Sequence, residues 1–443
     1  MGQLAVWMNA EFVGIWSNDH SHTFDYAPSW LESARARPLS LSLPLTRSLR
    51  LRGPEVESYF DNLLPDNDDI RRRIRTRFGA RSTEAFELLS AIGRDCVGAA
   101  QLLPVGENPP DIRQVEYQRL SDADVERILR GVAATPSFGM QDDLADLRIS
   151  IAGAQEKTAL LRLDGAWCKP LRSTPTTHIL KLPLGRVTRY NADFSASVEN
   201  EWLCAQIVRE LGLDVAETGI AQFGEQRALV VERFERLWVN DGVDPPHRYL
   251  IRLPQEDLCQ ATGTPPLRKY EKEGGPGMLQ CLDILGNSES PHESRLHFSL
   301  AQLAFWLLAA PDGHAKNFSV FINPGGTYSH TPLYDVLSAW PVIGKRAHQL
   351  PYHEAGLAMA LRSKNVHYKF GEIEPRHWHQ LAMLTGGEAA WSAMLRMVEQ
   401  VGSALGRVQP LLPAEFPAQV WNTISAGMQR HAAKFLRGVA ALS

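Results

Sequence analysis

The chain has 443 residues, 44% of them hydrophobic and 22% charged, and its 46 basic against 50 acidic side chains leave a formal net charge of −4. A chain of this length exceeds one ordinary core, so we expect two or three packed units. No apolar run approaches the roughly 20 residues that span a bilayer, which argues against a membrane protein, and the balanced charge argues against coating nucleic acid by bulk electrostatics.

Cysteine usage favours a cytoplasmic protein. The five cysteines are scattered without a CxxC pair, and the 14 histidines include no HExxH motif. This pattern indicates reduced thiols rather than a disulfide framework or a zinc site. The first residues lack a basic segment followed by a long apolar one, so they do not predict a secretory signal.

The N-terminal region predicts strands followed by a helix. Apolar runs at residues 4–8 and 12–16 flank Asn9-Ala10-Glu11, which predicts a hairpin, and residues 40–43 alternate with period 2. The acidic stretch at 65–69 then opens a helix that carries five arginines and meets Gly79 at its expected end. We interpret these arginines as a solvated helix face, with nucleic-acid binding as the alternative.

The remainder changes from strands to helices. Gly-Glu-Asn-Pro-Pro at 106–110 predicts a linker. Strands are expected at residues 148–151, 159–163, 178–182, 219–223 and 228–233, and helices at 197–211, 278–285, 300–309, 388–405 and 418–436. Ser299 is the expected N-cap of the helix at 300–309. A β-rich lobe followed by a helical lobe can form a cleft for a nucleotide.

The strongest chemical motif is DGHAKN, from Asp312 to Asn317, followed later by Asp335. Phosphoryl transfer needs a carboxylate near the acceptor hydroxyl and oxygen ligands for Mg²⁺. Kinases supply them as D-x-x-x-x-N and a second Asp after the next hairpin. Here the strand-like residues 318–322 and 331–333 would return Asp335 to the metal that Asn317 ligates. Alone, D-x-x-x-x-N also occurs by chance, and Asp-Gly is often only a turn.

Lys181 lies in an apolar strand, and Glu201 lies in the helix that follows. A buried lysine needs a partner, and kinases pair their phosphate-binding lysine with a helix glutamate. The pattern therefore favours an ion pair, with an ordinary solvent-facing strand lysine as the alternative.

Residues 150–158, SIAGAQEKT, are mostly small and include Lys157, so their backbone N–H groups could approach phosphate oxygens. The segment is not a Walker A loop, because that motif requires a glycine directly before its lysine. Taken alone, this loop indicates little.

Together these segments resemble the HipA family of serine/threonine kinases, the toxin halves of bacterial HipBA toxin–antitoxin pairs. The resemblance rests on SIAGAQEKTAL at 150–160, THILKLP at 177–183, VERF at 231–234, LPQED at 253–257, DGHAKNFSVF at 312–321 and Tyr334 before Asp335. In the N-terminal region, ARPLSLSLPL at 36–45 and YFDNLLP at 59–65 extend it, so that it covers nearly the whole chain.

The resemblance implies an α+β fold, namely a bilobal protein-kinase-like fold with a β-rich N-terminal subdomain and an all-helical C-terminal lobe. The expected domains are a HipA-type subdomain at 1–108, an N-lobe-like region with the phosphate loop and Lys181 at 109–254, and a helical lobe with the catalytic loop at 255–443.

Carried over by position, the resemblance implies that Asp312 is the catalytic base, that Asn317 and Asp335 hold Mg²⁺, and that Lys181 contacts the phosphates of ATP. The other implied nucleotide contacts are the phosphate-binding loop Ala152, Gly153, Ala154, Gln155, Glu156 and Lys157, the adenine-binding residues Glu232, Arg233 and Phe234, and His314, Ala315 and Lys316 beside Asn317.

Ser150 resembles the autophosphorylation site of the family, whose modification ejects the loop and inactivates the kinase. A phosphate brings about two negative charges, which would repel a nucleotide bound beside it. Pro311 stands where eukaryotic-type kinases carry an arginine that pairs with a phosphorylated activation loop. We therefore expect control through Ser150 and a partner protein.

The resemblance implies a toxin that transfers the γ-phosphate of ATP to a protein serine. Aminoacyl-tRNA synthetases, with glutamate–tRNA ligase first, are the expected targets, so translation would stall and the cell would enter growth arrest and persistence. A HipB-type helix-turn-helix antitoxin would silence the toxin and contact operator DNA in their joint repression of the operon. Lys364 and Arg376 are candidate direct DNA contacts, with plain surface charge as the alternative.

Two readings from other classes stay open. One is a small-molecule kinase of the aminoglycoside type, against which the N-terminal region and the Ser150 segment argue. The other is a catalytically silent co-repressor, against which the intact Asp312, Asn317, Asp335 and Lys181 argue.

Overall fold

The computed structural model describes residues 2–46, 50–133, 150–153, 155–187, 191–242 and 248–441. The chain divides into two compact units. The first comprises Met1–Leu182, Ala221–Leu267 and Val320–Tyr328, and the second comprises Pro183–Ile220, Arg268–Ser319 and Ser329–Ser443. In the part of the chain described, no helix is long and apolar enough to cross a membrane.

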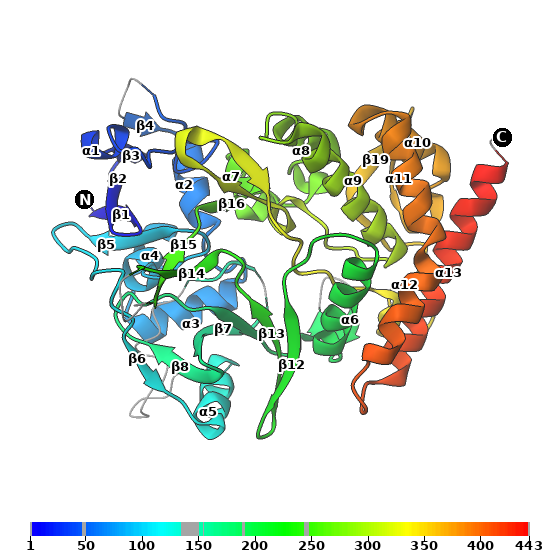
Figure 1. The fold of residues 1–443 in the computed structure, drawn as a ribbon, viewed down its shortest axis with the longest axis horizontal. Coiled ribbons are helices and arrows are strands. Elements are labelled where there is room, and N and C mark those ends of the chain that lie inside the picture. Colours follow the sequence, from blue (N-terminus) through cyan, green and yellow to red (C-terminus); the bar gives the residue numbers. More distant parts are fainter. Residues whose placement is uncertain are drawn as a thin grey trace. The chain divides into compact units, whose positions relative to one another are not determined.

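The first unit begins with an antiparallel sheet of order β4-β3-β2-β1-β5 and its covering helices (Figure 1, blue). The strands are β1 Gly2–Met8, β2 Glu11–Asn18, β3 His22–Tyr26, β4 Arg50–Arg52 and β5 Ala100–Pro104, and the helices are α1 Pro28–Leu31, α2 Pro54–Asp61, α3 Asp68–Phe78 and α4 Ala85–Ile92. Trp16 of β2 stacks on Phe60 of α2 with ring centroids 3.9 Å apart. The sheet therefore has an aromatic core of its own.

The predicted hairpin and the arginine-bearing helix are both confirmed. Asn9 and Ala10 join β1 to β2 with positive φ angles of 47° and 66°, which suit the twist of a tight hairpin. The side chain of Asn67 caps the start of α3, and Gly79 ends the helix with a φ of 67°. The interpretation of its arginines as a solvated face holds only in part: Arg72 and Arg75 are exposed. The Arg71 and Arg73 side chains are only 13% and 20% exposed and pair with Asp61 and Glu156.

A second sheet follows, with the order β12-β13-β9-β7-β8-β6. Its strands are β6 Tyr117–Arg119, β7 Lys157–Leu163, β8 Ala166–Pro170, β9 His178–Lys181, β12 Thr218–Phe223 and β13 Gln226–Glu232. Helix α5 Asp122–Ala133 packs Val125 and Leu129 against Leu160 and Leu180 of this sheet. The hairpin β14 Arg236–Asn240 and β15 Arg248–Arg252, the strand β16 Gln255–Asp257 and the helix α7 Leu258–Ala261 complete this region.

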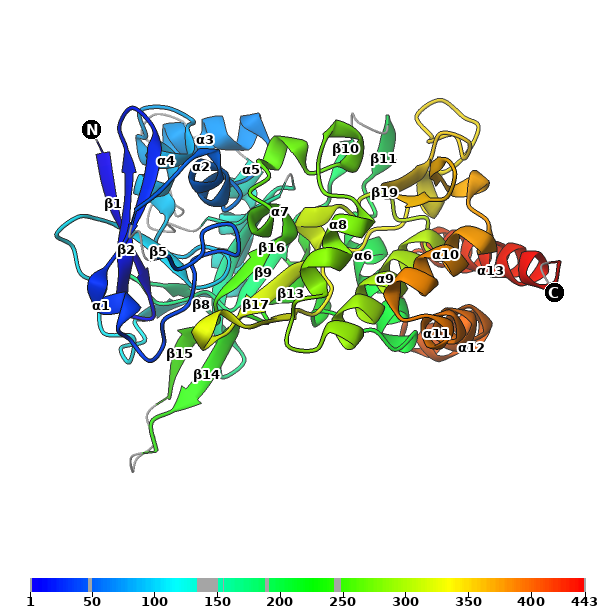
Figure 2. The same ribbon diagram turned by 90° about the horizontal axis from the view of Figure 1, so that it is seen from above.

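The second unit is mainly helical, and helices α10, α11 and α13 gather around α9 (Figure 2). Its helices are α6 Ser197–Glu210, α8 Met278–Leu285, α9 Pro291–Leu307, α10 Pro375–Thr385, α11 Glu388–Glu399, α12 Val401–Val408 and α13 Ala418–Ala440. Short strands are β10 Gly185–Val187, β11 Ala192–Phe194, β19 Gly356–Arg362 and β20 Val366–Lys369, while β17 Ser319–Ile322 and β18 Tyr328–His330 cross the division between the units. The mixed fold class is confirmed, but residues 255–443 also hold strands that an all-helical lobe would lack.

Two predicted helix boundaries are wrong. Helix α9 begins at Pro291 rather than after Ser299. Ser299 is fully buried inside the helix, where its Oγ lies 2.7 Å from Thr385 Oγ1. The single helix expected at 388–405 is two helices, α11 and α12, which meet at Gln400.

A buried ion-pair cluster holds the first unit together. Asp95, which follows α4, accepts hydrogen bonds from Arg233 at 3.1 Å, Arg236 at 3.0 Å and Arg252 at 3.0 Å. Glu235 pairs with Arg233 at 2.7 Å, and all five side chains are at most 6% exposed. Burial alone would raise the pKa of Asp95, but the three guanidinium groups hold it well below its ordinary value.

Removing the Asp95 charge is expected to destabilise the first unit. Asp95→Asn leaves three buried arginines with one carboxylate, and breaking a buried pair costs about 3–5 kcal/mol of unfolding free energy. Asp25→Asn, which loses the exposed Arg50 pair at 2.8 Å, is the control and should cost less than about 1 kcal/mol. Because a depressed pKa stabilises the fold only while the carboxyl is ionised, the Asp95→Asn deficit should shrink below about pH 4. Equal denaturant midpoints for the two variants would contradict this assignment.

Glu256 of β16 is a buried carboxyl that forms no ion pair within the part of the chain that the structure describes. Its side chain is fully buried, and Oε1 accepts a hydrogen bond from the Leu41 N–H at 2.8 Å. Oε2 has no hydrogen-bond partner among the described residues. Burial raises the pKa of Glu256 to about 8, so the folded chain keeps this carboxyl neutral at pH 7.

The Glu256 carboxyl predicts a stability that falls at alkaline pH. With a raised pKa, the stabilisation is present below the ordinary glutamate pKa of about 4.3 and is lost as the pH rises through about 8. Glu256→Gln keeps the acceptor for Leu41 and cannot ionise, so its melting temperature should match wild type at about pH 4 and exceed it at pH 8.5. Glu55→Gln, at an exposed position, should track wild type at both. A wild-type advantage at pH 8.5 would exclude a neutral Glu256.

Candidate active site

The loop at residues 150–157 is docked against the N-terminal part of the first unit. Ser150 is fully buried; its Oγ donates to the Leu63 carbonyl at 2.7 Å and its N–H to the Asp95 carbonyl at 3.1 Å. Further along, the Asp66 N–H donates to the Gly153 carbonyl at 3.2 Å. The loop is thus held by backbone groups of the segment that joins α2 to α3 and of Asp95 after α4.

The far end of the loop is tied to two elements. The Glu156 carboxylate forms an ion pair with Arg73 of α3. The Glu156 carbonyl accepts from the Leu182 N–H at 3.0 Å, and Gln155 Nε2 donates to the Leu182 carbonyl at 2.5 Å. These contacts fix the loop to α3 and to the end of β9. Ala154, which the resemblance also places in this loop, lies outside the described residues.

Two lysines lie opposite one another at the end of this loop. In the antiparallel pairing of β7 with β9, Lys157 is the direct partner of Lys181, so both side chains project from the same face of the sheet. Lys181 is only 5% exposed. Gly153 has a φ of 108°, and a β-carbon added there would lie 2.7 Å from Lys157 Nζ. The register therefore places the two lysines that the resemblance assigns to the phosphates side by side.

Arg233 has a structural task in this fold. Its guanidinium donates to buried acceptors on Asp95, Cys96, Thr176 and Glu235. Its backbone N–H and carbonyl are bonded to Thr177 and Arg236. The adenine contacts implied for this segment are therefore left to exposed Glu232 and to Phe234, whose ring packs edge-on against Phe321 at 5.8 Å.

Lys181 belongs to the first unit, and Glu201, on α6, belongs to the second. Both side chains are 5% exposed. Buried charges of this kind require partners, and the ion pair between these two residues stays a prediction.

The catalytic motif is a tight turn after α9. The His314 N–H donates to the Asp312 carbonyl at 2.8 Å, and the Asn317 N–H donates to the His314 carbonyl at 2.9 Å. A β-carbon on Gly313 would lie 2.1 Å from the Phe305 ring, so the turn packs directly on the helix. Within the turn, the Asp312 side chain is 39% exposed to solvent, whereas the His314 side chain is only 4% exposed.

Asn317 and Asp335 lie together in the second unit. Asn317 Nδ2 donates to the Asp335 carbonyl at 3.4 Å. Tyr334, which precedes Asp335, donates a hydrogen bond from its hydroxyl to the Lys316 carbonyl at 2.8 Å. This bond holds the segment that carries Asp335 against the segment that carries Asn317. Asp335 has a φ of 62°, a left-handed conformation that non-glycine residues rarely adopt.

The Asn317 side chain fits the role of a metal ligand. Asn317 is 2% exposed, and its Oδ1 has no hydrogen-bond partner among the described residues. A buried amide oxygen without a partner is costly unless a ligand satisfies it. Amide and carboxylate oxygens are the donors that Mg²⁺ prefers.

Tyr270 is a site residue that the sequence interpretation missed. Its hydroxyl donates a hydrogen bond to Asp312 Oδ1, and its ring packs edge-on against His314 with centroids 4.9 Å apart. The available signal was the segment Lys269-Tyr270-Glu271 before a Gly-Gly turn. Nothing in its spacing from Asp312 points to the contact.

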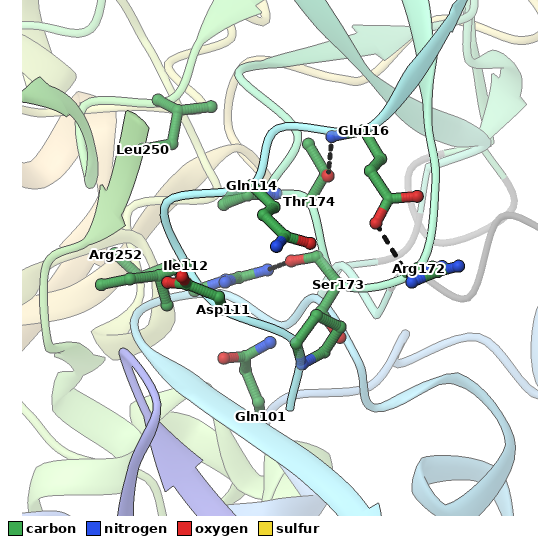
Figure 3. A pocket seen from close by; sticks show the side chains of 12 residues that line it. Gln101, Asp111, Ile112, Gln114, Glu116, Arg172, Ser173, Thr174, Leu250 and Arg252 are labelled. Atoms are coloured by element: carbon green, nitrogen blue, oxygen red, sulfur yellow. Dashed lines mark hydrogen bonds and ion pairs between the residues drawn. The ribbon is translucent and has the colours of Figure 1, made fainter. Parts of the chain in front are cut away.

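A separate hollow in the first unit contains none of the predicted site residues (Figure 3). Arg252 Nη2 donates to the Ser173 carbonyl at 2.9 Å across its wall, and the Glu116 N–H donates to Thr174 Oγ1 at 3.0 Å. Its interior has room for about one water molecule. It is too small for a nucleotide.

Comparison with known proteins matches both parts of the chain to one family. A family model described as HipA-like C-terminal domain matches residues 149–408, and one described as HipA N-terminal domain matches residues 4–103. Y4mE of Sinorhizobium fredii, a protein named as a kinase, is 34% identical over 387 residues, which cover 86% of each chain. The serine/threonine-protein kinase toxin HipA of Shewanella oneidensis is 28% identical over 329 residues, 71% of this chain and 69% of that protein.

A solved structure has the same fold. HipA of Shewanella oneidensis, in complex with HipB and its operator DNA, superposes with a TM-score of 0.79 at 22% identity, over 99% of this chain and 98% of that one.

The Arg73–Glu156 pair predicts how firmly the loop is docked. Arg73→Leu should lower the opening free energy of residues 150–157 by about 1 kcal/mol, so their amides should exchange hydrogen several-fold faster. Arg72→Leu removes the same charge from α3, but Arg72 is exposed and, among the described residues, pairs with Asp69 within the helix, so loop exchange should stay at the wild-type rate. Identical exchange in both variants would show that the pair does not hold the loop.

Proposed function

The chain belongs to the HipA family of kinases, and on this basis we propose that it is an ATP-dependent serine/threonine protein kinase that acts as the toxin of a toxin–antitoxin pair. One observation carries the proposal. Within the second unit, the turn after α9 presents the accessible carboxylate of Asp312, and the same segment places the unpartnered Oδ1 of Asn317 beside Asp335. These are the groups that phosphoryl transfer to a hydroxyl requires.

Each group has a definite task in this proposal. Asp312 accepts the proton of the acceptor serine, and its 39% exposure leaves it accessible to a protein substrate. Lys157 and Lys181 neutralise phosphate charge from one face of the sheet. Asn317 and Asp335 would hold Mg²⁺, which when bound offsets the negative charge of the phosphates. The loop 152–157 would contribute backbone N–H groups to the phosphates, while Glu232, Phe234 and residues 314–316 would complete the nucleotide contacts.

Regulation by Ser150 follows from its burial. Ser150 Oγ has no access to solvent while it donates to Leu63, so phosphorylation requires the loop to leave its docked position. A phosphoserine carries about two negative charges and three acceptor oxygens, which do not fit beside that carbonyl. Modification would therefore prevent redocking and remove Gly153 and Lys157 from the phosphate site.

The proposed partners are a HipB-type helix-turn-helix antitoxin and, mainly through it, operator DNA. The similarity to a HipA solved with HipB and operator DNA supports this part. Lys364 and Arg376 are exposed on the second unit, where a DNA backbone contact is open to them.

The proposed protein substrate is an aminoacyl-tRNA synthetase, with glutamate–tRNA ligase first, whose phosphorylation would stall translation and arrest growth. We retain 1–108, 109–254 and 255–443 as the proposed domains.

The kinase proposal predicts a selective loss in Asp312→Asn. With γ-labelled ATP and Mg²⁺, wild-type protein should label itself and purified glutamate–tRNA ligase, and Asp312→Asn should lower the rate about 10²- to 10⁴-fold because the general base is gone. Asp283→Asn, an exposed carboxylate on α8, should keep the wild-type rate. Ser150→Ala should abolish self-labelling while it still labels the synthetase.

Each part of the proposal is contradicted by a different result of this experiment. No label on any protein of a lysate would contradict the kinase activity. Label on another protein but not on the synthetase would contradict only the target. Undiminished self-labelling of Ser150→Ala would contradict only the regulatory site.

A further inference from the structure

We propose that Tyr270 is a positioning residue, which orients the Asp312 carboxylate so that Oδ2 alone receives the proton of the acceptor hydroxyl. This inference rests on the proposed kinase function and adds a residue to its machinery. The Tyr270 hydroxyl donates to Asp312 Oδ1. Tyr270 is 9% exposed, whereas the Asp312 side chain is 39% exposed. A buried donor therefore fixes one oxygen of an accessible carboxylate.

The two oxygens of Asp312 have different surroundings. His314 Nε2 also lies on the Oδ1 side, 3.8 Å away, which is too long for a hydrogen bond but close enough to fill the space. The described residues donate no hydrogen bond to Oδ2. Each oxygen of an ionised carboxylate has two lone-pair sites. Tyr270 occupies one site of Oδ1 and His314 crowds the same side, so Oδ2 is the more accessible acceptor for a substrate.

Tyr270 is itself held firmly. Its carbonyl accepts from the Glu273 and Gly275 N–H groups, each at 2.9 Å. The turn leaves no room for a side chain at Gly275, where a β-carbon would lie 2.0 Å from the Arg268 carbonyl. This short turn gives the tyrosine backbone a single position.

The neighbour of Tyr270 ties the turn to a strand of the same unit. Glu271 Oε2 accepts from the Ala360 N–H of β19 at 2.6 Å, and Glu271 also pairs with Arg362. The Tyr270 ring then packs edge-on against the His314 ring at 4.9 Å. The hydroxyl is thus aimed at Asp312 by contacts on both sides of the tyrosine.

Orientation matters because the χ2 angle of an aspartate has a broad distribution, so an unrestrained carboxylate rotates. A general base must lie within about 2.6–3.2 Å of the proton that it accepts, and a carboxylate that rotates freely meets this condition for only part of the time. The Tyr270 hydroxyl keeps its own proton throughout. The acceptor O–H proton passes to Asp312 Oδ2 as the acceptor oxygen bonds to the γ-phosphorus and the bond from phosphorus to the β,γ-bridging oxygen breaks. ADP leaves, and Asp312 returns the proton to water.

Tyr270→Phe tests this role in the full-length protein with γ-labelled ATP, Mg²⁺ and a phosphorylated target identified with wild type. Loss of one hydrogen bond to an ionised group should lower kcat about 10- to 100-fold, with the KM for ATP unchanged. Tyr352→Phe is the matched control, because it removes a hydroxyl of the same unit that bonds His431 Nε2 at 2.8 Å. It should keep the wild-type kcat even where it lowers the melting temperature.

A double-mutant cycle separates positioning from a merely structural role. Because Tyr270 acts through Asp312, adding Tyr270→Phe to Asp312→Asn should cause no further loss of rate, whereas independent effects would multiply. Two results with an active wild type would overturn the role of Tyr270 and leave the kinase function standing. One is an unchanged kcat in Tyr270→Phe, and the other is a double variant whose loss of rate equals the product of the two single losses. A wild-type protein that phosphorylates nothing overturns the kinase function, and the role of Tyr270 with it.

Discussion

The first unit depends on one carboxylate, that of Asp95, which three buried arginines share. Taking these charges out of water is costly, and only the paired geometry with Glu235 offsets that cost. The backbone carbonyl of Asp95 also accepts from Ser150 at 3.1 Å. Asp95, which lies between α4 and β5, therefore fixes both the start of the 150–157 loop and the arginines that follow β13 and belong to β14 and β15.

Features with local signals are the ones that the sequence predicts well. The turn at Asn9 and the cap and stop of α3 each involve residues within a few positions of one another. The same holds for the turn between Asp312 and Asn317, whose backbone hydrogen bonds lie within the motif. The start of α9 is mispredicted because Ser299 is a typical capping residue, yet its hydroxyl bonds Thr385 inside the fold. A capping residue is informative only where no distant partner competes for it.

Long-range packing decides the rest of the site and leaves little trace in the sequence. Arg233 looks like a surface charge but is buried because Asp95, 138 residues earlier, lies beside it. The opposition of Lys157 and Lys181 depends on strand register, which one residue of slippage would remove. Tyr270 bonds Asp312, which lies 42 residues later, while its neighbour Glu271 bonds Ala360 of β19. These contacts join elements that are distant along the chain, so no spacing rule reveals them.

On the regulation proposed for Ser150, its enclosure makes inactivation depend on how often the loop opens. While Ser150 Oγ is sealed against the Leu63 carbonyl, the rate of modification equals the rate of chemistry multiplied by the fraction of molecules whose loop has left. A nucleotide that binds only the docked loop lowers that fraction by mass action. On the proposed function, ATP has two opposed effects on self-inactivation, because it donates the phosphate and also holds the loop docked. The rate at which the loop opens is therefore an upper limit on how fast the protein can inactivate itself.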